Sequence, residues 1–499
     1  MIRAVLAVAL LHGVLLLPSH PAGLRAATWA GLPVELPIVV LLVVAWRGWP
    51  VRAAVVALGA AILMLRLADL GSFQAFGRPF NPVLDLHLLG SGWALLSDTV
   101  GRGQAMVAIG AALLAGVGLG ALLWTGLAGL AQLGGRRWGL LVAVAAPMLV
   151  PGAATADLVP DLRERLARMA RATADLRAFE AELPADPVGV PRFAALEGRD
   201  VLLLFVESYG RSFVEGSPLA GPRLAAVEDR LAAAGWHARS AWAEAPVRGG
   251  QSWLAHATLL SGLWVDTQAR YERLVASERR SLNRLFRGAG WQTGAAMPAI
   301  TLDWPEAAWF GYDVTLDAEG LGYRGEPFEW VTMPDQYTLS AMDRLLRGPG
   351  PDMIEAALIT SHAPWTPLPR ILPWERIGDG SVFDGTRRDG DTPREVWADP
   401  ERVREQHALS LDHVLEVVGQ YVARFGDGAL VVVLGDHQPA ALLTGPDASA
   451  DVPVHVLADD PALLDRLPPP FGPGLAPGGR TIRMDRLRTV LAEVFEAAG

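Results

Sequence analysis

The feature that most constrains the fold is an uninterrupted apolar run, Ala429 to Leu434, which stops abruptly at Gly435, Asp436 and His437. Side chains that are apolar on both faces are typical of a strand in a parallel sheet that helices cover on both sides. Open α/β sheets bind their ligands outside the carboxyl ends of such strands. The run therefore predicts a central strand, 429–435, that brings a carboxylate and an imidazole to a ligand site.

A second apolar run has the same design, because it starts at Asp200 and ends at Glu207. If the two strands are parallel neighbours, the side chains of Glu207, Asp436 and His437 converge at one edge of the sheet. Two carboxylates and an imidazole suit Mn²⁺ or Zn²⁺, with Mg²⁺ as an alternative. Since the chain has no Cys, oxygen and imidazole nitrogen must supply the ligands of any metal.

Apolar runs alternate with helical stretches throughout residues 198–499. The predicted strands are 199–206, 294–298, 354–360, 429–435 and 452–458. The predicted helices are 224–235, 252–261, 281–290, 336–346, 402–425 and 484–498. This alternation predicts an α/β fold with a largely parallel sheet, in a domain of roughly 300 residues that can bury one large core.

Residues 1–156 are predicted to form a multi-span α-helical membrane domain of about five helices, since a span needs roughly 20 apolar residues. The candidate spans are 4–18, 28–46, 53–67, 104–123 and 139–159. The first run could instead be the apolar core of a signal peptide, because Arg3 precedes it.

Positive charges predict the orientation of these spans. Arg3, Arg47, Arg52, Arg136 and Arg137 all fall on one side if the five spans exist, and that side is the cytoplasm by the positive-inside rule. The large carboxy-terminal domain then lies on the extracytoplasmic side of a bacterial-type inner (plasma) membrane.

The segment 157–197 is predicted to connect the two domains. Its first part, 157–183, is charged and periodic, which indicates an amphipathic juxtamembrane helix. The prolines of 184–191 indicate a linker. Net charge is −10 and no Lys/Arg cluster is present, so nucleic acid is not an expected partner.

Ser252 is the candidate nucleophile. Gly249 and Gly250 allow a tight loop before it, and Ser252 falls where the predicted helix 252–261 begins. A helix amino end offers free amide hydrogens and a positive dipole end to a phosphate or sulfate. Coordination to a metal would activate the hydroxyl there. The alternative is that Ser252 is an ordinary helix N-cap.

Two histidines on strands or strand ends have both a functional and a structural interpretation. His362 follows the predicted strand 354–360, so it could hold a substrate phosphate, protonate a leaving group or be a hydrogen-bonded loop residue. His455 alternates with apolar neighbours and is either a satisfied strand histidine or a ligand of a second metal. His256 and His413 fall within helical patterns and are interpreted as structural or surface residues.

An aromatic segment, 302–313, could line a groove for a sugar or a lipid headgroup. It contains Trp304, Trp309 and Tyr312, for which core packing is the alternative. Arg324 could pair with an anionic substrate or simply be exposed to solvent.

Four motifs resemble the membrane-anchored, sulfatase-like branch of the alkaline phosphatase superfamily, which includes lipoteichoic acid synthases and phosphoglycerol or phosphoethanolamine transferases. The motifs are LLLFVESYGRS, GGQSWLAHATLLSGL, SHAPW and VVVLGDHQPA. The layout of spans, juxtamembrane helix and α/β domain is similar as well. The resemblance implies an alkaline-phosphatase-like fold for residues 198–499.

In that family an acid after the first strand, a Thr or Ser nucleophile and a late Asp-His pair bind the metal. The resemblance places these roles on Glu207, Ser252, Asp436 and His437, and it places contact with the substrate's phosphate on His362. Lipoteichoic acid synthases resemble this segment with Thr at the position of Ser252. A Cys-type sulfatase is excluded because the chain has no Cys.

The resemblance also implies a function, which is a metal-dependent phosphotransferase. Such an enzyme would move a phosphoglycerol- or phosphoethanolamine-type headgroup from a membrane lipid to an envelope glycan or lipid acceptor. The reaction would be a two-step in-line displacement through a covalent phospho-serine at Ser252. The alternatives are a phosphodiesterase or sulfatase-type hydrolase of the same fold, and a non-catalytic membrane-tethered scaffold.

Overall fold

The computed structural model describes residues 2–46, 48–82, 85, 92–93, 97, 101–132, 154–155, 158–386, 390–445 and 447–496. The chain divides into two compact units, Met1–Asp175 and Leu176–Gly499, which are described separately. Helix α7, Leu158–Glu182, runs across the boundary between them and matches the predicted amphipathic segment 157–183.

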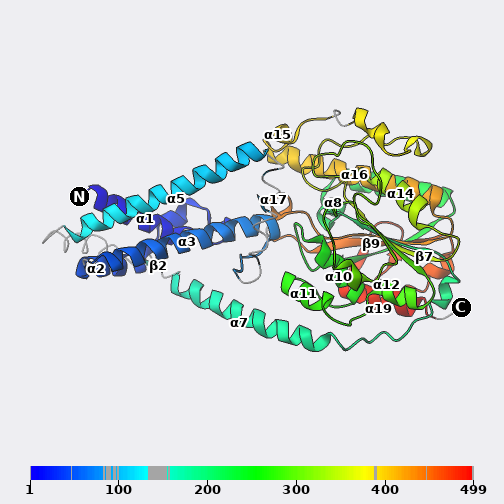
Figure 1. Ribbon diagram of the computed structural model, residues 1–499, viewed down its shortest axis with the longest axis horizontal. Coiled ribbons are helices and arrows are strands. Elements are labelled where there is room, and N and C mark those ends of the chain that lie inside the picture. Colours follow the sequence, from blue (N-terminus) through cyan, green and yellow to red (C-terminus); the bar gives the residue numbers. More distant parts are fainter. Residues whose placement is uncertain are drawn as a thin grey trace. The chain divides into compact units, whose positions relative to one another are not determined.

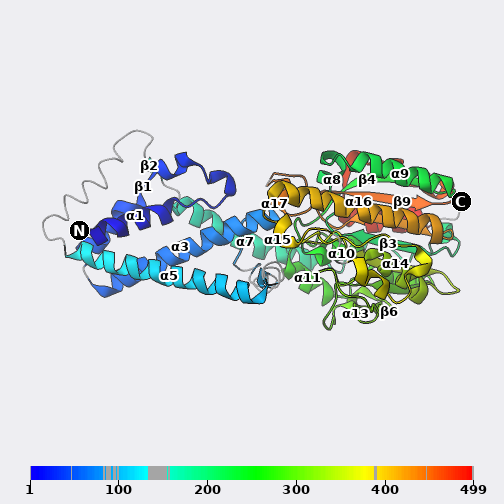
Figure 2. The same cartoon turned by 90° about the horizontal axis from the view of Figure 1, so that it is seen from above.

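Among the described residues of the first unit are four apolar helices (Figures 1 and 2). They are α1 (Ile2–Leu16), α2 (Glu35–Ala45), α3 (Trp49–Phe76) and α5 (Arg102–Ala131). Within the described residues, α3 and α5 are the two helices long and apolar enough to cross a membrane. The prediction of about five spans is therefore confirmed only as two apolar helices of spanning length, and most of the fifth candidate, 139–159, lies outside the described residues.

The predicted span 28–46 is not one helix. A 3₁₀ turn (Ala26–Ala30) and a short strand, β1 (Leu32–Pro33), which pairs with β2 (Ala154–Thr155), precede α2. Pro33 has no amide hydrogen to continue a helix, so the apolar run breaks there. The 11 residues of α2 give a length of about 16 Å, roughly half of a bilayer's hydrocarbon thickness.

Small residues let α1 and α5 pack closely. A Cβ added to Gly126 would lie 2.4 Å from the carbonyl oxygen of Arg3, so a larger residue would force the helices apart. Large apolar side chains are nevertheless exposed on α3 and α5, namely Leu58, Met64, Leu67, Met106, Val107, Leu113, Leu114 and Val117. A surface of this kind is typical of contact with lipid or with another protein.

The second unit is built on a nine-stranded mixed sheet. Its strands are β3 (Val201–Val206), β4 (His237–Glu244), β5 (Gln292–Ala296), β6 (Val314–Leu316), β7 (Asp352–Leu358), β8 (Leu430–Gly435), β9 (Asp451–Ala458), β10 (Gly472–Pro473) and β11 (Gly478–Arg483). Their order is β10-β4-β9-β8-β3-β7-β5-β6, with β11 beside β4. Strands β8, β3, β7, β5 and β6 are parallel, as the sequence predicts for the centre of the sheet.

The other side of the sheet differs from the prediction. Strand β9 is antiparallel to β8, and β4 is antiparallel to β9, so the sheet is mixed and mostly parallel. Strand β4 was not predicted, because its sequence HARSAWAE has neither a clean apolar run nor a regular alternation.

Helices cover both faces of this sheet (Figure 1). One core cluster contains residues of α9 (Ala220–Ala233), α14 (Asp335–Leu346) and α16 (Pro400–Phe425). The opposite cluster contains residues of α10 (Ser252–Ser261), α12 (Leu282–Gly288) and α19 (Met484–Val494). The shorter helices are α8 (Arg211–Gly216), α11 (Gln268–Val275), α13 (Ala307–Phe310), α15 (Pro393–Val396), α17 (Ala441–Thr444) and α18 (Pro461–Leu464).

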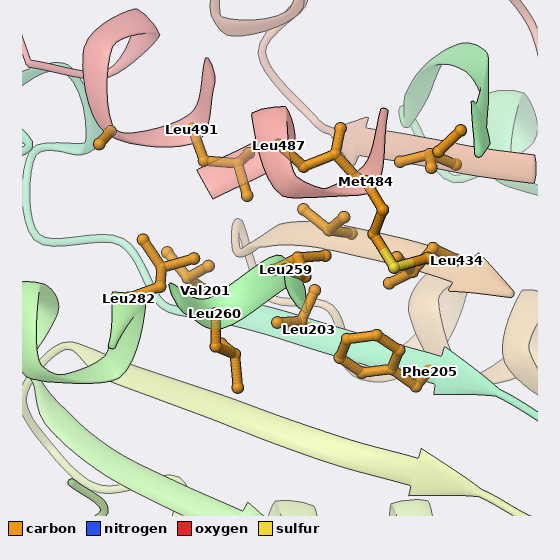
Figure 3. Packing of buried hydrophobic residues seen from close by; sticks show 14 of the residues in the cluster. Val201, Leu203, Phe205, Leu259, Leu260, Leu282, Leu434, Met484, Leu487 and Leu491 are labelled. Atoms are coloured by element: carbon orange, nitrogen blue, oxygen red, sulfur yellow. The ribbon is translucent and has the colours of Figure 1, made fainter. Parts of the chain in front are cut away.

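Strand β3 serves both cores because its side chains alternate between the two faces. Val201, Leu203 and Phe205 lie in the cluster with α10 and α19, as Figure 3 shows. Leu202 and Leu204 lie in the cluster with α16 on the other face. All six residues of the strand are buried, which explains the continuous apolar run in its sequence.

Residues 176–197 belong to the second unit. Phe193 is fully buried and stacks on Phe286 of α12, with ring centroids 3.8 Å apart. Asp186 accepts two hydrogen bonds, each of 2.9 Å, from the buried guanidinium of Arg488 on α19. This segment therefore adds apolar contacts and a buried ion pair to the carboxy-terminal core.

Candidate metal and nucleophile site

The register of the central strands brings the first acids together. Val206 of β3 pairs with Gly435 of β8, so the next residues along each strand, Glu207 and Asp436, follow at the same sheet edge. The loop after β3 passes close over β8, because a Cβ on Gly435 would lie only 1.8 Å from the carbonyl oxygen of Tyr209. Glycine is therefore required immediately before Asp436.

Glu207, Asp436 and His437 form a compact buried cluster. Each offers one ligand atom, and these atoms all lie within 4.8 Å of one another. His437 Nε2 is 3.5 Å from Glu207 Oε1 and 3.6 Å from Asp436 Oδ2. The sequence predicted that these three side chains meet, and the structure places them together.

The neighbouring hydrogen bonds orient the ligand atoms toward the cluster. His437 Nδ1 is 2.8 Å from the carbonyl oxygen of Gln438, an arrangement that puts the proton on Nδ1 and leaves the Nε2 lone pair facing the acids. Asp436 Oδ1 accepts the backbone amides of Ser208 (2.8 Å) and His437 (2.6 Å), and its Oδ2 faces His437. Two carboxylate oxygens and an imidazole nitrogen fit a divalent cation such as Mn²⁺ or Zn²⁺.

The pKa shifts of the three cluster residues indicate that a bound cation would stabilise their buried charges. Burial, followed by the charge of Glu207, raises the pKa of Asp436 to about 6. Burial also acts to raise the pKa of Glu207, but the imidazoles of His437 and His362 outweigh it and lower that pKa to about 2. Burial opposes the charged form of His437, yet the two acids raise its pKa. Two buried carboxylates that share one imidazole are stabilised by a bound cation.

Ser252 lies beside this cluster as the first residue of α10. Its Oγ donates to Glu207 Oε2 at 3.1 Å and is 3.3 Å from His437 Nε2. The N-cap position belongs to Gln251, so Ser252 does not fill the ordinary capping role considered from the sequence.

An unusual loop directs Ser252 toward the cluster. Gly249, Gly250 and Gln251 all have positive φ, at 74°, 137° and 67°. The amide of Gly249 donates to the carbonyl oxygen of Gln438 at 2.8 Å, which ties this loop to the residues after β8. A left-handed conformation at Gln251 costs free energy, of order 1 kcal/mol, and such strain is often found at functional sites.

His362 follows β7 and lines the same cavity as Glu207, Ser252 and Asp436. The cavity has a volume of about 310 Å³. His362 Nδ1 is 2.7 Å from the carbonyl oxygen of Ala363, and its ring stacks on Trp330 with centroids 4.6 Å apart. Large apolar side chains form much of the wall, namely Phe205, Trp253, Met297, Ile300, Trp304, Phe310, Tyr312 and Trp330.

The three remaining predicted residues lie away from this cavity. His455 is held within the sheet by Ser240 Oγ at 2.7 Å and Tyr209 Oη at 3.0 Å, and burial lowers its pKa to about 3. Trp309 is buried in the core, and Arg324 is exposed on a loop. These positions agree with the structural alternatives that the sequence left open.

Sequence reasoning missed a polar group on the cavity wall. Glu355 of β7 and His256 of α10 both line the cavity, and Glu355 is completely buried. One signal was available, since Glu355 is an acid inside an otherwise apolar part of β7. The four-residue spacing from Ser252 to His256 on one helix was another.

No protein-family model matches this sequence, and no curated protein sequence matches it. Similar solved structures include the lipoteichoic acid synthase LtaP from Listeria monocytogenes, with 12% identity, a TM-score of 0.40 and coverage of 65% of this chain and 78% of that one. The phosphoglycerol transferase GacH from Streptococcus pyogenes, in complex with sn-glycerol-1-phosphate, has 10% identity, a TM-score of 0.41 and coverage of 66% and 81%. The C-terminal periplasmic domain of EptC from Escherichia coli, in complex with Zn, has 14% identity, a TM-score of 0.38 and coverage of 60% and 82%.

Proposed function

We propose that this chain is a metal-dependent phosphotransferase that acts on lipid headgroups. It moves a phosphoglycerol- or phosphoethanolamine-type group from a membrane lipid to a hydroxyl of an envelope glycan or lipid, through a phospho-serine at Ser252. The observation that carries the proposal is the position of Ser252 Oγ, 3.1 Å from Glu207 and 3.3 Å from His437 at the start of a helix.

Glu207, Asp436, His437 and the Ser252 hydroxyl would hold the cation, which we expect to be Mn²⁺ or Zn²⁺, with Mg²⁺ as the alternative. When bound, the cation supplies positive charge that lowers the pKa of the hydroxyl and stabilises the phosphoryl oxygens. The backbone amides at the start of α10 point toward an anion at Ser252. His362, on the same cavity wall, contacts a phosphoryl oxygen.

The membrane arrangement is part of the same proposal. Residues 1–156 form the membrane domain, 157–197 the juxtamembrane helix and linker, and 198–499 the extracytoplasmic catalytic domain of a bacterial-type inner membrane protein. The exposed apolar side chains of α3 and α5 support attachment to a bilayer. A bilayer also contains the lipid donor. Multiple passes with a cytoplasmic amino end follow from the arginine distribution.

The test uses the full chain in vesicles that contain labelled phosphatidylglycerol or phosphatidylethanolamine, with Mn²⁺ and a glycan acceptor. We expect Ser252→Ala to slow headgroup release at least about 1000-fold, since the attacking atom is lost. Ser252→Thr should retain measurable release because it keeps a hydroxyl. Mass spectrometry should find the transferred group on Ser252 of the wild type.

Ser381→Ala, at an exposed hydroxyl outside the cavity, is the matched control and should match the wild type. Full release by Ser252→Ala would contradict the proposed nucleophile. A rate of headgroup release that does not depend on the glycan acceptor would identify a hydrolase. A wild-type protein that neither binds metal nor releases any headgroup would be a scaffold.

A further inference from the structure

One wall of the cavity carries a buried acid–imidazole pair that the phosphotransfer scheme above does not use. His256 Nδ1 is 2.6 Å from Glu355 Oε1, and Tyr312 Oη donates to Glu355 Oε2 at 2.7 Å. His256, Glu355 and Tyr312 all line the cavity that contains Ser252. The pair comes from two elements, α10 and β7, that are far apart in sequence.

His256 stands on the same face of α10 as the nucleophile. Ser252 and His256 are four residues apart on α10, and side chains at that spacing lie one turn apart on one face, about 5–6 Å between their Cβ atoms. Both side chains also line the same cavity. His256 is thus near Ser252 without touching the metal ligands.

The surroundings of the imidazole fix its orientation. Its ring stacks on Phe205 of β3, with centroids 3.7 Å apart. The contact with Glu355 puts one proton on Nδ1. Nε2 is therefore the nitrogen that can exchange a proton with a molecule in the cavity. Glu355 has no exposed surface, and its Oε1 holds the imidazole at Nδ1.

A purely structural role explains this arrangement less well. A buried ionisable pair is costly to desolvate, and apolar side chains of similar size would often serve a core equally well. Here the pair opens on a cavity and lies beside a nucleophile. An imidazole oriented by a carboxylate next to a hydroxyl nucleophile is the recurrent arrangement of general acid–base catalysis.

We propose, on the basis of the function proposed above, that His256 is the general acid for the departing lipid alcohol and the general base for the incoming acceptor hydroxyl. Glu355 is its positioning residue. In the first half-reaction the Ser252 Oγ–P bond forms while the P–O bond to the lipid alcohol breaks. The proton on His256 Nε2 moves to the departing oxygen, and the proton of Ser252 has already passed to water. The lipid alcohol leaves neutral.

The second half-reaction returns the proton. The acceptor hydroxyl gives its proton to His256 Nε2 as its oxygen bonds to phosphorus, and the P–Oγ bond to Ser252 breaks. His256 is then protonated again, so the cycle needs no further acid. His362, which lines the same cavity, keeps its separate proposed contact with the phosphoryl group.

The dependence of the rate on the leaving group tests this role. Two donors are compared in single turnovers with the full chain in detergent and Mn²⁺: a phosphatidyl headgroup donor, whose alcohol needs a proton, and a p-nitrophenyl phosphodiester, whose phenolate does not. We expect His256→Gln to slow release from the lipid donor at least about 100-fold, and release from the nitrophenyl donor less than about tenfold. Glu355→Gln should show the same pattern with a smaller loss.

The matched control is His237→Gln, at an exposed histidine at the start of β4, which should leave both rates unchanged. Equal losses with the two donors would overturn the proposal, because a merely structural residue cannot distinguish leaving groups. If His256→Gln does not fold, Glu355→Gln decides by the same criterion. If the wild type releases product from neither donor, the proposed function is overturned together with the role of His256. If the variants lose the same fraction of the release rate with both donors, only the role of His256 is overturned.

Discussion

Glu207 and Asp436 share a buried space in which two negative charges repel each other. Each carboxylate is held by its own neighbours: Ser208 Oγ donates to Glu207 Oε1 at 2.8 Å, and two backbone amides donate to Asp436 Oδ1. Glu207 Oε1 and Asp436 Oδ2 both face His437 Nε2, at 3.5 and 3.6 Å. At the scale of residues, the site is therefore built for a cation before any substrate is considered.

Metal removal tests this conclusion. A chelator is expected to lower the Tm of the full chain, because a cation bound only to the native state stabilises it by about 2.7 kcal/mol at a hundredfold excess over its Kd. Glu207→Gln keeps the side-chain shape but removes the charge, and it should weaken Mn²⁺ or Zn²⁺ binding at least about tenfold by calorimetry. Glu375→Gln, at an exposed carboxylate, is the control. An unchanged Tm after chelation would remove these residues from any metal site.

At the scale of elements, the site depends on loops that pass unusually close to strand ends. The loop after β3 runs over the end of β8, where Gly435 leaves room for the Tyr209 carbonyl. The loop before α10 is tied to the residues after β8 through the Gly249 amide. The positions of Glu207, Ser252 and Asp436 are thus coupled through backbone contacts as well as through their own side chains.

A single methyl group should disrupt this coupling. Gly435→Ala places a Cβ 1.8 Å from the Tyr209 carbonyl oxygen, so we expect a loss of about 2–3 kcal/mol in unfolding free energy together with weaker metal binding. Urea denaturation and calorimetry would measure the two effects. Gly216→Ala, where an added Cβ meets nothing within 4 Å, should change neither quantity. Unchanged metal binding in Gly435→Ala would show that the loop can move without moving the acids.

At the scale of the whole molecule, the carboxy-terminal unit begins before its first central strand. Residues 176–197 contribute Phe179, Phe193 and Leu196 to its core, and Asp186 pairs with Arg488, whose side chain is fully buried. Removal of this segment would leave a guanidinium in the core without its carboxylate. Such a loss is expected to cost about 3–5 kcal/mol.

Two fragments test the extent of the unit. Residues 176–499 should fold cooperatively and bind metal, whereas residues 198–499 should be less stable by several kcal/mol for the reason just given. Thermal and urea denaturation of both fragments measure the difference. Asp186→Asn in the longer fragment should reproduce a large part of the loss, because it removes the charge that pairs with Arg488. Equal stability of the two fragments would show that 176–197 is only a linker.

Much of the central architecture could be predicted from short stretches of sequence. The start of α10 at Ser252 and the strands that end just before Glu207 and Asp436 follow from local apolar runs and turn residues. The amino-terminal helices were harder, because hydropathy alone does not show that the run before Trp46 breaks at Pro33. Strand β4 left no regular pattern, since its burial changes along its length.

The sequence by itself determined which strands are buried and which acids, hydroxyl and imidazole follow them, because a strand covered on both faces must be apolar along its whole length. Only the tertiary structure decided that β9 runs antiparallel to β8, that Asp186 meets Arg488, and that His256 meets an acid 99 residues away. Contacts between distant segments leave no periodic trace in either segment, so they become visible only when the chain has folded.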